Sequence, residues 1–417
     1  MSTRHVLRLC AFAAVTLAAA CSTNTEPGPA APSGALGALP RALSTGEQRV
    51  IGAANDFSFA LFRRLSAAQK DSNVFASPLS ASMALGMAMT GAAGTTYDEM
   101  RTTLGFDASA SDTEIGESYK SLIALLRGLD PGVDFRIANS IWYRTGFPVD
   151  QAFVDRSRNW FDARASALDF ASASAVPTIN DWVSTSTAGK IPTILDRIEP
   201  DQVMFLINAI YFKGSWRTRF DPARTVTAPF HAIGGDQSAK LMRRDGTIRW
   251  LQTANFEAVD LPYGNGAYAM TMVLPAVGAS VDDVAASLQR SAWTTWMGEF
   301  HDADVELALP RIRLEWERTL IPDLQSLGMH AAFEDGRADF SRMATPGTQL
   351  FISVVKQKTY VDINEDGTEA AAVTNVGISL TSAPVRRSFT VDRPFIVVLR
   401  ERLSGTILFM GKITRLP

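Results

Sequence analysis

Residues 203–212 read Val-Met-Phe-Leu-Ile-Asn-Ala-Ile-Tyr-Phe and are followed by Lys213 and Gly214. Asn208 is the one residue of this run that is neither aliphatic nor aromatic. A continuous apolar run of this kind is typical of a central β-strand that is covered on both faces. We therefore expect a large sheet around this strand, with helices or a second sheet packed on each side of it.

The rest of the chain predicts both helices and antiparallel strands. Apolar spacing predicts a helix over 46–65, a buried helix over 79–93 opened by Ser77-Pro78, and a helix over 179–190. The predicted strands are 267–274, 305–309, 394–399 and 406–413, the last two forming a hairpin around Ser404-Gly405. These elements indicate an α+β fold with large, mainly antiparallel sheets.

The composition limits the classes of function. The chain has 417 residues, is 46% hydrophobic and 20% charged, and carries a formal net charge of -3. This charge balance gives no electrostatic reason to expect a nucleic-acid partner. Since the composition is even from about Thr45 onward, with no second linker and no repeat, residues 45–417 are predicted to form one domain with two or more packed sheets.

The first 44 residues are typical of a targeting segment and a tether. Arg4, His5 and Arg8 give a positive start, and residues 7–20 are nearly all apolar but too few to span a bilayer, so residues 1–20 are predicted to be a signal peptide. Leu-Ala-Ala-Ala before Cys21 resembles the lipobox of bacterial lipoproteins, although the Leu lies one place further from the Cys than is usual. Ordinary cleavage after Ala20 is the alternative.

If Cys21 is lipidated, the mature chain is anchored in the bacterial envelope, at the outer membrane or cell surface. Otherwise it is extracellular or periplasmic. The segment 22–43 is rich in Ser, Thr, Pro, Ala and Gly, so residues 21–44 are predicted to be a flexible tether. Cys10 leaves with the signal, which makes Cys21 the only remaining thiol and rules out an internal disulfide.

No enzyme signature is present in the sequence. The chain lacks the H-E-x-x-H, C-x-x-C, G-x-S-x-G and Walker motifs, and His231, His301 and His330 lie in ordinary surroundings. Asp-Ile-Asn-Glu-Asp-Gly over 362–367 matches half of a calcium loop, but the twelfth position is Val373 instead of Glu. We therefore expect no metal, no cofactor and no enzymatic activity.

Residues 370–384 contain no charged or aromatic side chain. An exposed Ser/Thr/Ala loop is one interpretation of this segment. The other is a conditional strand, because alternate residues form a small or apolar set. That set comprises Thr368, Ala370, Ala372, Thr374, Val376, Ile378 and Leu380. Small side chains would allow the segment to slide between two existing strands, and a charge near its start would oppose this insertion.

Six stretches of the chain resemble motifs of the serpins, the serine protease inhibitors. They are Asn364–Ala372 (the hinge), Asn73–Ser80, Ile207–Trp216, Asn180–Ile191 and the C-terminal stretches Asp392–Phe395 and Leu408–Ile413. The resemblance covers residues 43–417. It implies a fold of three β-sheets with eight or nine helices and an exposed reactive-centre loop.

The resemblance also implies a mechanism of inhibition. A target protease attacks the loop and forms an acyl-enzyme, and the freed loop arm then inserts into the main sheet and traps the protease. The native state must therefore be metastable. The resemblance implies the following site residues: hinge residues Glu365, Gly367, Thr368, Glu369, Ala370, Ala371 and Ala372; shutter residues Ser77, Ser80, Asn208 and Gln357; and Trp216 at the breach.

The resemblance implies a hinge of the inhibitory kind, because Thr368 to Ala372 are small and uncharged apart from Glu369, which falls on the outward-facing set. Gln357 stands where animal relatives often have His, and could hydrogen-bond Asn208 or Ser77.

The usual hinge spacing places the cleaved bond between Thr381 and Ser382, with Leu380 and Ala383 as alternates. No Lys or Arg occurs from Ala370 to Val385, so we expect an elastase-, subtilisin- or chymotrypsin-like target, bound covalently by a monomer. The alternatives are a non-inhibitory serpin-fold binding or chaperone protein, and a lipid-anchored solute-binding protein or hydrolase.

Overall fold

The computed structural model describes residues 34–344, 350–368 and 386–417. Residues 32–417 form one compact unit. The α-helices in the described part of the chain are α1 (Thr45–Ala68), α2 (Pro78–Met89), α3 (Gly94–Thr103), α4 (Asp112–Gly128), α5 (Gln151–Phe161), α6 (Ala175–Ser186), α7 (Val281–Ser287), α8 (Arg290–Glu299) and α9 (Ile321–Ser326). No helix within these ranges is both long and apolar enough to cross a membrane.

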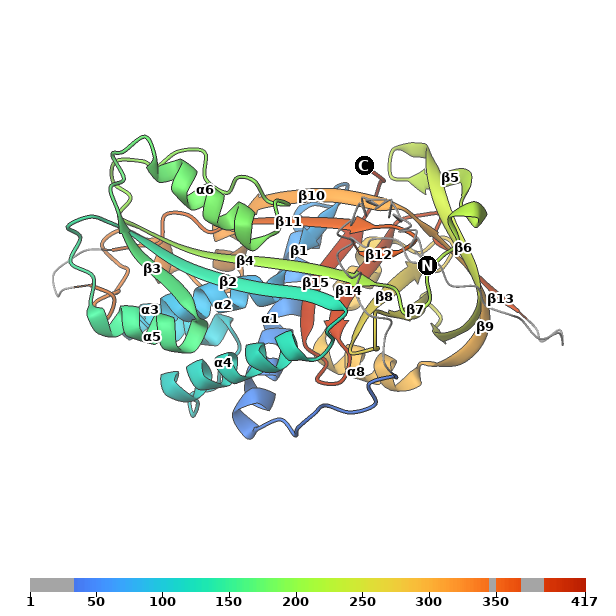
Figure 1. Ribbon diagram of the computed structural model, residues 1–417, viewed down its shortest axis with the longest axis horizontal. Coiled ribbons are helices and arrows are strands. Elements are labelled where there is room, and N and C mark those ends of the chain that lie inside the picture. Colours follow the sequence, from blue (N-terminus) through green and yellow to red (C-terminus); the bar gives the residue numbers. More distant parts are fainter. Residues whose placement is uncertain (1–33, 345–349, 369–385) are drawn as a thin grey trace, which may run out of the picture. The chain divides into compact units, whose positions relative to one another are not determined.

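The strands are assembled in two hydrogen-bonded sheets (Figure 1). They are β1 (Val74–Ala76), β2 (Val133–Arg144), β3 (Ala163–Leu168), β4 (Met204–Ser215), β5 (Val226–Ala232), β6 (Gly235–Gln252), β7 (Phe256–Pro262), β8 (Tyr268–Pro275), β9 (His301–Pro310), β10 (Ile312–Thr319), β11 (Lys356–Ile363), β12 (Gly367–Thr368), β13 (Arg387–Thr390), β14 (Phe395–Glu401) and β15 (Ile407–Ile413). The four strands predicted from the C-terminal half and the hairpin of β14 and β15 are confirmed.

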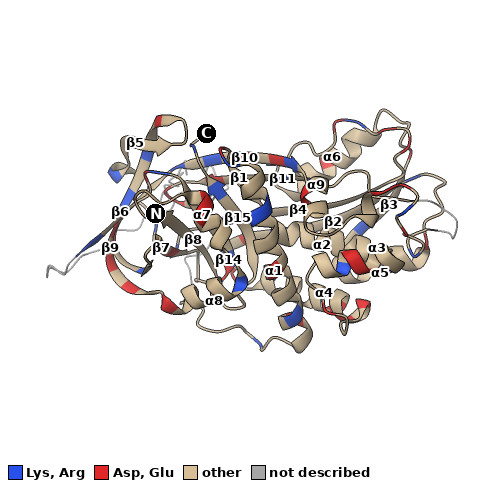
Figure 2. Ribbon diagram, turned by 180° about the vertical axis from the view of Figure 1, so that it is seen from behind, with Lys and Arg blue, Asp and Glu red and all other residues tan. Residues whose placement is uncertain are grey.

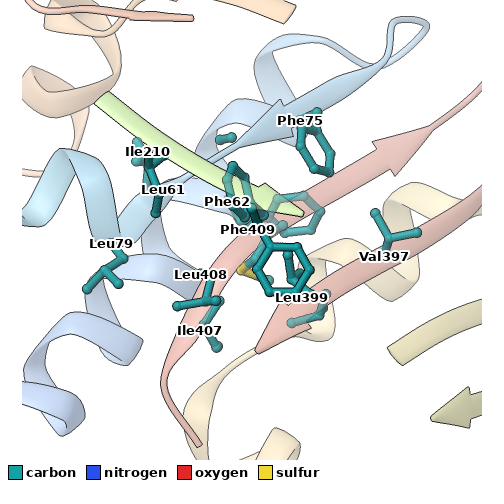
Figure 3. Close-up of a cluster of buried hydrophobic side chains, with 14 of the residues drawn as sticks. Leu61, Phe62, Phe75, Leu79, Ile210, Val397, Leu399, Ile407, Leu408 and Phe409 are labelled. Atoms are coloured by element: carbon teal, nitrogen blue, oxygen red, sulfur yellow. The ribbon is translucent and has the colours of Figure 1, made fainter. Parts of the chain in front are cut away.

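The six-stranded sheet has the order β10-β11-β12-β4-β2-β3. The run quoted at the outset forms β4, which is covered on both faces as predicted. Phe205 and Ile207 pack against α6, while Ile210 and Phe212 join the main core on the opposite face, to which α2 belongs. Figure 3 labels Ile210 and Leu61 of α1 among the buried side chains of this core.

The nine-stranded sheet joins what the resemblance treats as two separate sheets. Its order is β1-β15-β14-β8-β7-β6-β9-β13, with β5 also paired to β6. The 18-residue strand β6 makes this possible, because different parts of it pair with β5, β9 and β7. The sheets are therefore continuous through β6 in the hydrogen-bond pattern.

Local sequence explains where the helices begin and end. Ser44 caps α1 by accepting a hydrogen bond from the Glu47 amide, and the Glu47 carboxylate accepts one from the Ser44 amide. The predicted helix over 179–190 is displaced: α6 runs from Ala175 to Ser186. It ends early because Ala188 and Gly189 take left-handed φ values of +51° and +78°, and the Gly189 amide turns back to the Ser184 carbonyl.

Candidate functional site

The two-residue strand β12 lies between β11 and β4 at one end of the six-stranded sheet. Thr368 is paired with Ile363 of β11 on one side and with Gly214 of β4 on the other, both antiparallel. A tight turn leads into it, in which the Asn364 amide donates to the Gly367 carbonyl over 2.9 Å. The first residues of the hinge are thus already part of the sheet.

Gly367 can be accommodated at this position because it has no side chain. Its φ is +151°, and a Cβ atom built there would lie 2.1 Å from the Gly214 carbonyl oxygen and 2.7 Å from the Ser215 Cα. Both of these neighbours are backbone atoms of β4, which cannot move aside without breaking the ladder. Any other residue at this position would push the hinge away from β4.

Thr368 is buried and its hydroxyl lies 2.7 Å from that of Tyr263. The Tyr263 ring in turn stacks on Trp216, with 4.4 Å between ring centroids. Trp216 closes the group by donating from its indole nitrogen to the Asn364 carbonyl over 2.9 Å. Burial raises the pKa of the Tyr263 hydroxyl far above its usual value, so the contact with Thr368 stays between neutral groups.

Glu365 ties the turn over residues 364–367 to Arg311 and Thr225. Its buried carboxylate accepts hydrogen bonds from the Arg311 guanidinium at 2.7–2.9 Å and from the Thr225 hydroxyl. Burial acts to raise the pKa of Glu365, but the hydrogen bonds from Arg311 and Thr225 outweigh it and hold the pKa below its ordinary value. The ionised carboxylate therefore stabilises this end of the sheet.

The four predicted shutter residues lie in two linked pairs further along β4 and β11. The Gln357 amide group bonds the backbone of Ser77 twice, donating to its carbonyl over 2.7 Å and accepting from its amide over 3.0 Å. Ser80 donates to the Asn208 side chain, which donates onward to Asn139 over 2.6 Å. Of the two partners expected for Gln357, the structure shows Ser77.

Between these two pairs the six-stranded sheet has an unfilled strand position, which we call the slot. In the described part of the chain, no ladder joins β4 directly to β11, and β12 connects them only at Gly214, Ser215 and Ile363. The part of the slot beyond Asn208 opens over a cavity of about 380 Å³ between α2, β4 and the start of β11. The facing edges of β4 and β11 could accept another strand.

The far end of the loop is anchored on the other sheet. β13 pairs in parallel with β9, Arg386 donates to Asp304 over 3.2 Å, and the Arg387 guanidinium lies 4.1 Å from the centre of the Trp250 ring. Glu369, Ala370–Ala372, Leu380–Ala383 and Cys21 lie outside the described residues.

Sequence reasoning did not find the partners that hold the hinge in place. Tyr263, Thr225 and Arg311 contact Thr368 or Glu365 across 105, 140 and 54 residues of sequence. None of them lies in a motif that the resemblance quoted, so the sequence carries no local signal for them.

These features define a protein whose six-stranded sheet has, in the described part of the chain, an unfilled strand position next to β12. Comparison with known proteins identifies a family with the expected fold. Residues 52–416 match the family model described as "Serpin (serine protease inhibitor)". The chain therefore belongs to the serpin family.

Several relatives cover nearly the whole domain. The chain is 30% identical to human Serpin B11 over 86% of this chain and 97% of the relative. It is 32% identical to Iripin-2 of Ixodes ricinus, in a match that covers 89% of this chain and 94% of the relative. It is 30% identical to human leukocyte elastase inhibitor, in a match that covers 86% of this chain and 97% of the relative. Among solved structures, the native state of the thermophilic serpin tengpin superimposes with a TM-score of 0.82 at 28% identity, covering 90% of this chain and 96% of that one.

Proposed function

We propose that the chain inhibits serine endopeptidases as a suicide substrate. In this proposal the protease cleaves the segment between β12 and β13 and becomes acylated on its catalytic Ser. The freed arm then extends β12 into the slot before the acyl-enzyme can be hydrolysed. The observation that carries the proposal is β12 itself, because a strand paired on both sides already occupies the head of the slot.

The two ladders of β12 make the proposal specific. Since Thr368 faces Gly214 and Ile363, an antiparallel strand continued for six residues would bring Thr374 between Asn208 and Gln357. The pairing of Thr368 with Gly214 and its pairing with Ile363 each give this position independently. The side chains two and four residues further on, Val376 and Ile378, would then face α2 and enter the 380 Å³ cavity.

The proposed target is an elastase-, subtilisin- or chymotrypsin-like protease. The bond after Thr381 is the first candidate, and those after Leu380 and Ala383 are the alternates. The absence of Lys and Arg from 370–385 favours a protease with an apolar primary pocket. One of the relatives is named leukocyte elastase inhibitor, which supports the same class.

A direct mixing experiment tests the proposal. The mature protein is incubated with pancreatic elastase, chymotrypsin or subtilisin, and the products are separated on denaturing gels and weighed by mass spectrometry. We expect a band at the summed mass, and the mass of the released C-terminal fragment will identify the cleaved bond. Clean cleavage without an adduct by all three proteases would contradict inhibition and favour a non-inhibitory binding or chaperone role.

We further propose that Cys21 is lipidated and anchors the protein in a bacterial envelope. The support is the sequence around Cys21 and the tether that follows it. Mass spectrometry of the mature N-terminal peptide after expression in a bacterium is expected to show a diacylglyceryl-modified Cys21. With Cys21→Ala the protein is expected in the soluble fraction, and an unmodified N-terminus at Cys21 would contradict the proposal.

A further inference from the structure

The cavity beneath the slot has one wall of small residues and an opening lined by apolar side chains. Ala81, Ala84 and Ala88 of α2 form one wall, and their methyl groups leave the space that larger side chains would fill. Phe351 and Val354, which precede β11, stand at its opening and are 38% and 39% exposed. These are two of the four large apolar side chains that are exposed in the described part of the chain.

Three charged residues lie in the lining of the cavity. They are Arg144, Lys356 and Asp201, two cations and one carboxylate. Lys356 is already paired with Glu317 over 2.7 Å. Arg144 donates to the Pro200 carbonyl over 3.2 Å and, among the described residues, forms no ion pair, so the rest of its guanidinium is free for a ligand.

We propose that this cavity binds a fatty-acid-class anion, with the alkyl chain along α2 and the carboxylate beside Arg144. A volume of about 380 Å³ lies in the range of small-molecule sites. An alkyl chain matches the apolar walls, and a carboxylate matches the planar, unpaired guanidinium at the mouth.

Binding at this site has a consequence for inhibition, and this second part rests on the proposed function. The inserted loop would place Val376 and Ile378 in the same space. The ligand and the inserted strand therefore exclude one another, and a ligand that binds only the intact form must stabilise that form. An occupied cavity would delay insertion, so that the bound protease hydrolyses the acyl-enzyme and is released.

Binding is tested first, without any protease. Sodium decanoate is titrated into the intact mature protein by calorimetry, beside decanol and decylamine. We expect one site per molecule, with decanoate bound most tightly. Tighter binding of decylamine would overturn the assignment of an anionic head group.

Two variants locate the site. Ala84→Leu fills the cavity and should weaken decanoate binding by about tenfold or more, whereas Ala67→Leu on an exposed position of α1 should have no effect. Arg144→Gln, on the exposed rim, should weaken decanoate about fivefold and leave decanol unchanged. Binding by Ala84→Leu and Arg144→Gln as tight as that of the unmodified protein would overturn the proposal.

Regulation is tested separately. Saturating decanoate is expected to lower the fraction of covalent protease complex and to raise the fraction of cleaved product. An unchanged ratio would overturn the regulatory part. If no covalent complex forms even without decanoate, the proposed inhibition fails, while the binding measurements still decide whether the site exists.

Discussion

Gly367 and Thr368 fix the point at which the hinge enters the sheet, each through a different property. Gly367 is needed for its missing side chain, since a Cβ would meet the backbone of β4. Thr368 is needed for a small, neutral side chain that reaches Tyr263. The requirement for Gly and for small residues could be predicted from the sequence. Tyr263 could not, because its partner lies 105 residues away.

Thr368→Arg is expected to turn the inhibitor into a substrate. A guanidinium at this position would be buried beside Tyr263 with no carboxylate partner, which disfavours insertion from its first residue. We expect the ratio of cleaved product to covalent complex to rise by about tenfold or more on denaturing gels. Thr368→Ser, which keeps the hydroxyl, is the matched control. A Thr368→Arg protein that still forms the complex efficiently would contradict hinge insertion.

Glu365 makes the hinge sensitive to acid. Because its pKa is lower in the folded protein, its contribution to stability is complete above the ordinary value of 4.5 and is lost as the pH falls through the folded pKa. Glu365→Gln should therefore lower the free energy of unfolding by about 1–2 kcal/mol at pH 7. The difference from the unmodified protein should shrink by pH 3 in urea titrations. A difference that does not change with pH would show that the charge is unimportant.

At the scale of elements, the Gln357 side chain joins β11 to the start of α2. Gln357 bonds both the amide and the carbonyl of Ser77, the residue that caps α2. Ser77 also donates from its hydroxyl to the Leu408 carbonyl of β15 over 2.8 Å. Movement of β11 away from β4 must therefore strain or break bonds at the start of α2.

Gln357→Leu should destabilise the intact form. The buried Ser77 amide would be left without its partner, while the Ser77 carbonyl would still accept from the Ala81 amide, so we expect a loss of about 1–3 kcal/mol in the free energy of unfolding. Lys358→Gln, a change to the next residue of β11, is the control and should stay within about 0.5 kcal/mol. Equal stability of the two variants in urea titrations would mean that solvent or a rearranged neighbour replaces Gln357.

Element type was more predictable than element limits. The apolar run of β4 and the spacing of α1 identified both elements, because burial and periodicity determine them. The C-terminal limit of α6 depends on the left-handed pair Ala188 and Gly189, and the continuity of the nine-stranded sheet depends on the pairing of β6 along its length. These are tertiary features, and no local pattern encodes them.

For the whole molecule, the proposed mechanism requires a more stable arrangement of the same chain, in which the slot is filled. Filling it with residues 369–380 would add a ladder on each side of a new central strand and place apolar side chains in the cavity above α2. Each added hydrogen bond contributes about 0.5–1.5 kcal/mol, so a dozen rival the stability of an ordinary domain.

Cleavage of the loop should therefore raise the unfolding temperature. Intact protein and protein nicked between residues 380 and 384 are compared by scanning calorimetry at the same pH and concentration. We expect the nicked form to unfold at least about 10 °C higher. Nicked Thr368→Arg protein is the control and should gain less. Identical unfolding temperatures for nicked and intact protein would show that the loop does not insert.

The presence of β12 in the uncut protein also bears on timing. Nucleation is the slow step in strand pairing, because two chain segments must meet before any backbone hydrogen bond forms. Elongation then adds hydrogen bonds one residue after another. In this structure β12 is already paired on both sides. In the proposed mechanism only elongation would remain after cleavage, so insertion would compete with deacylation from a strand that has already started.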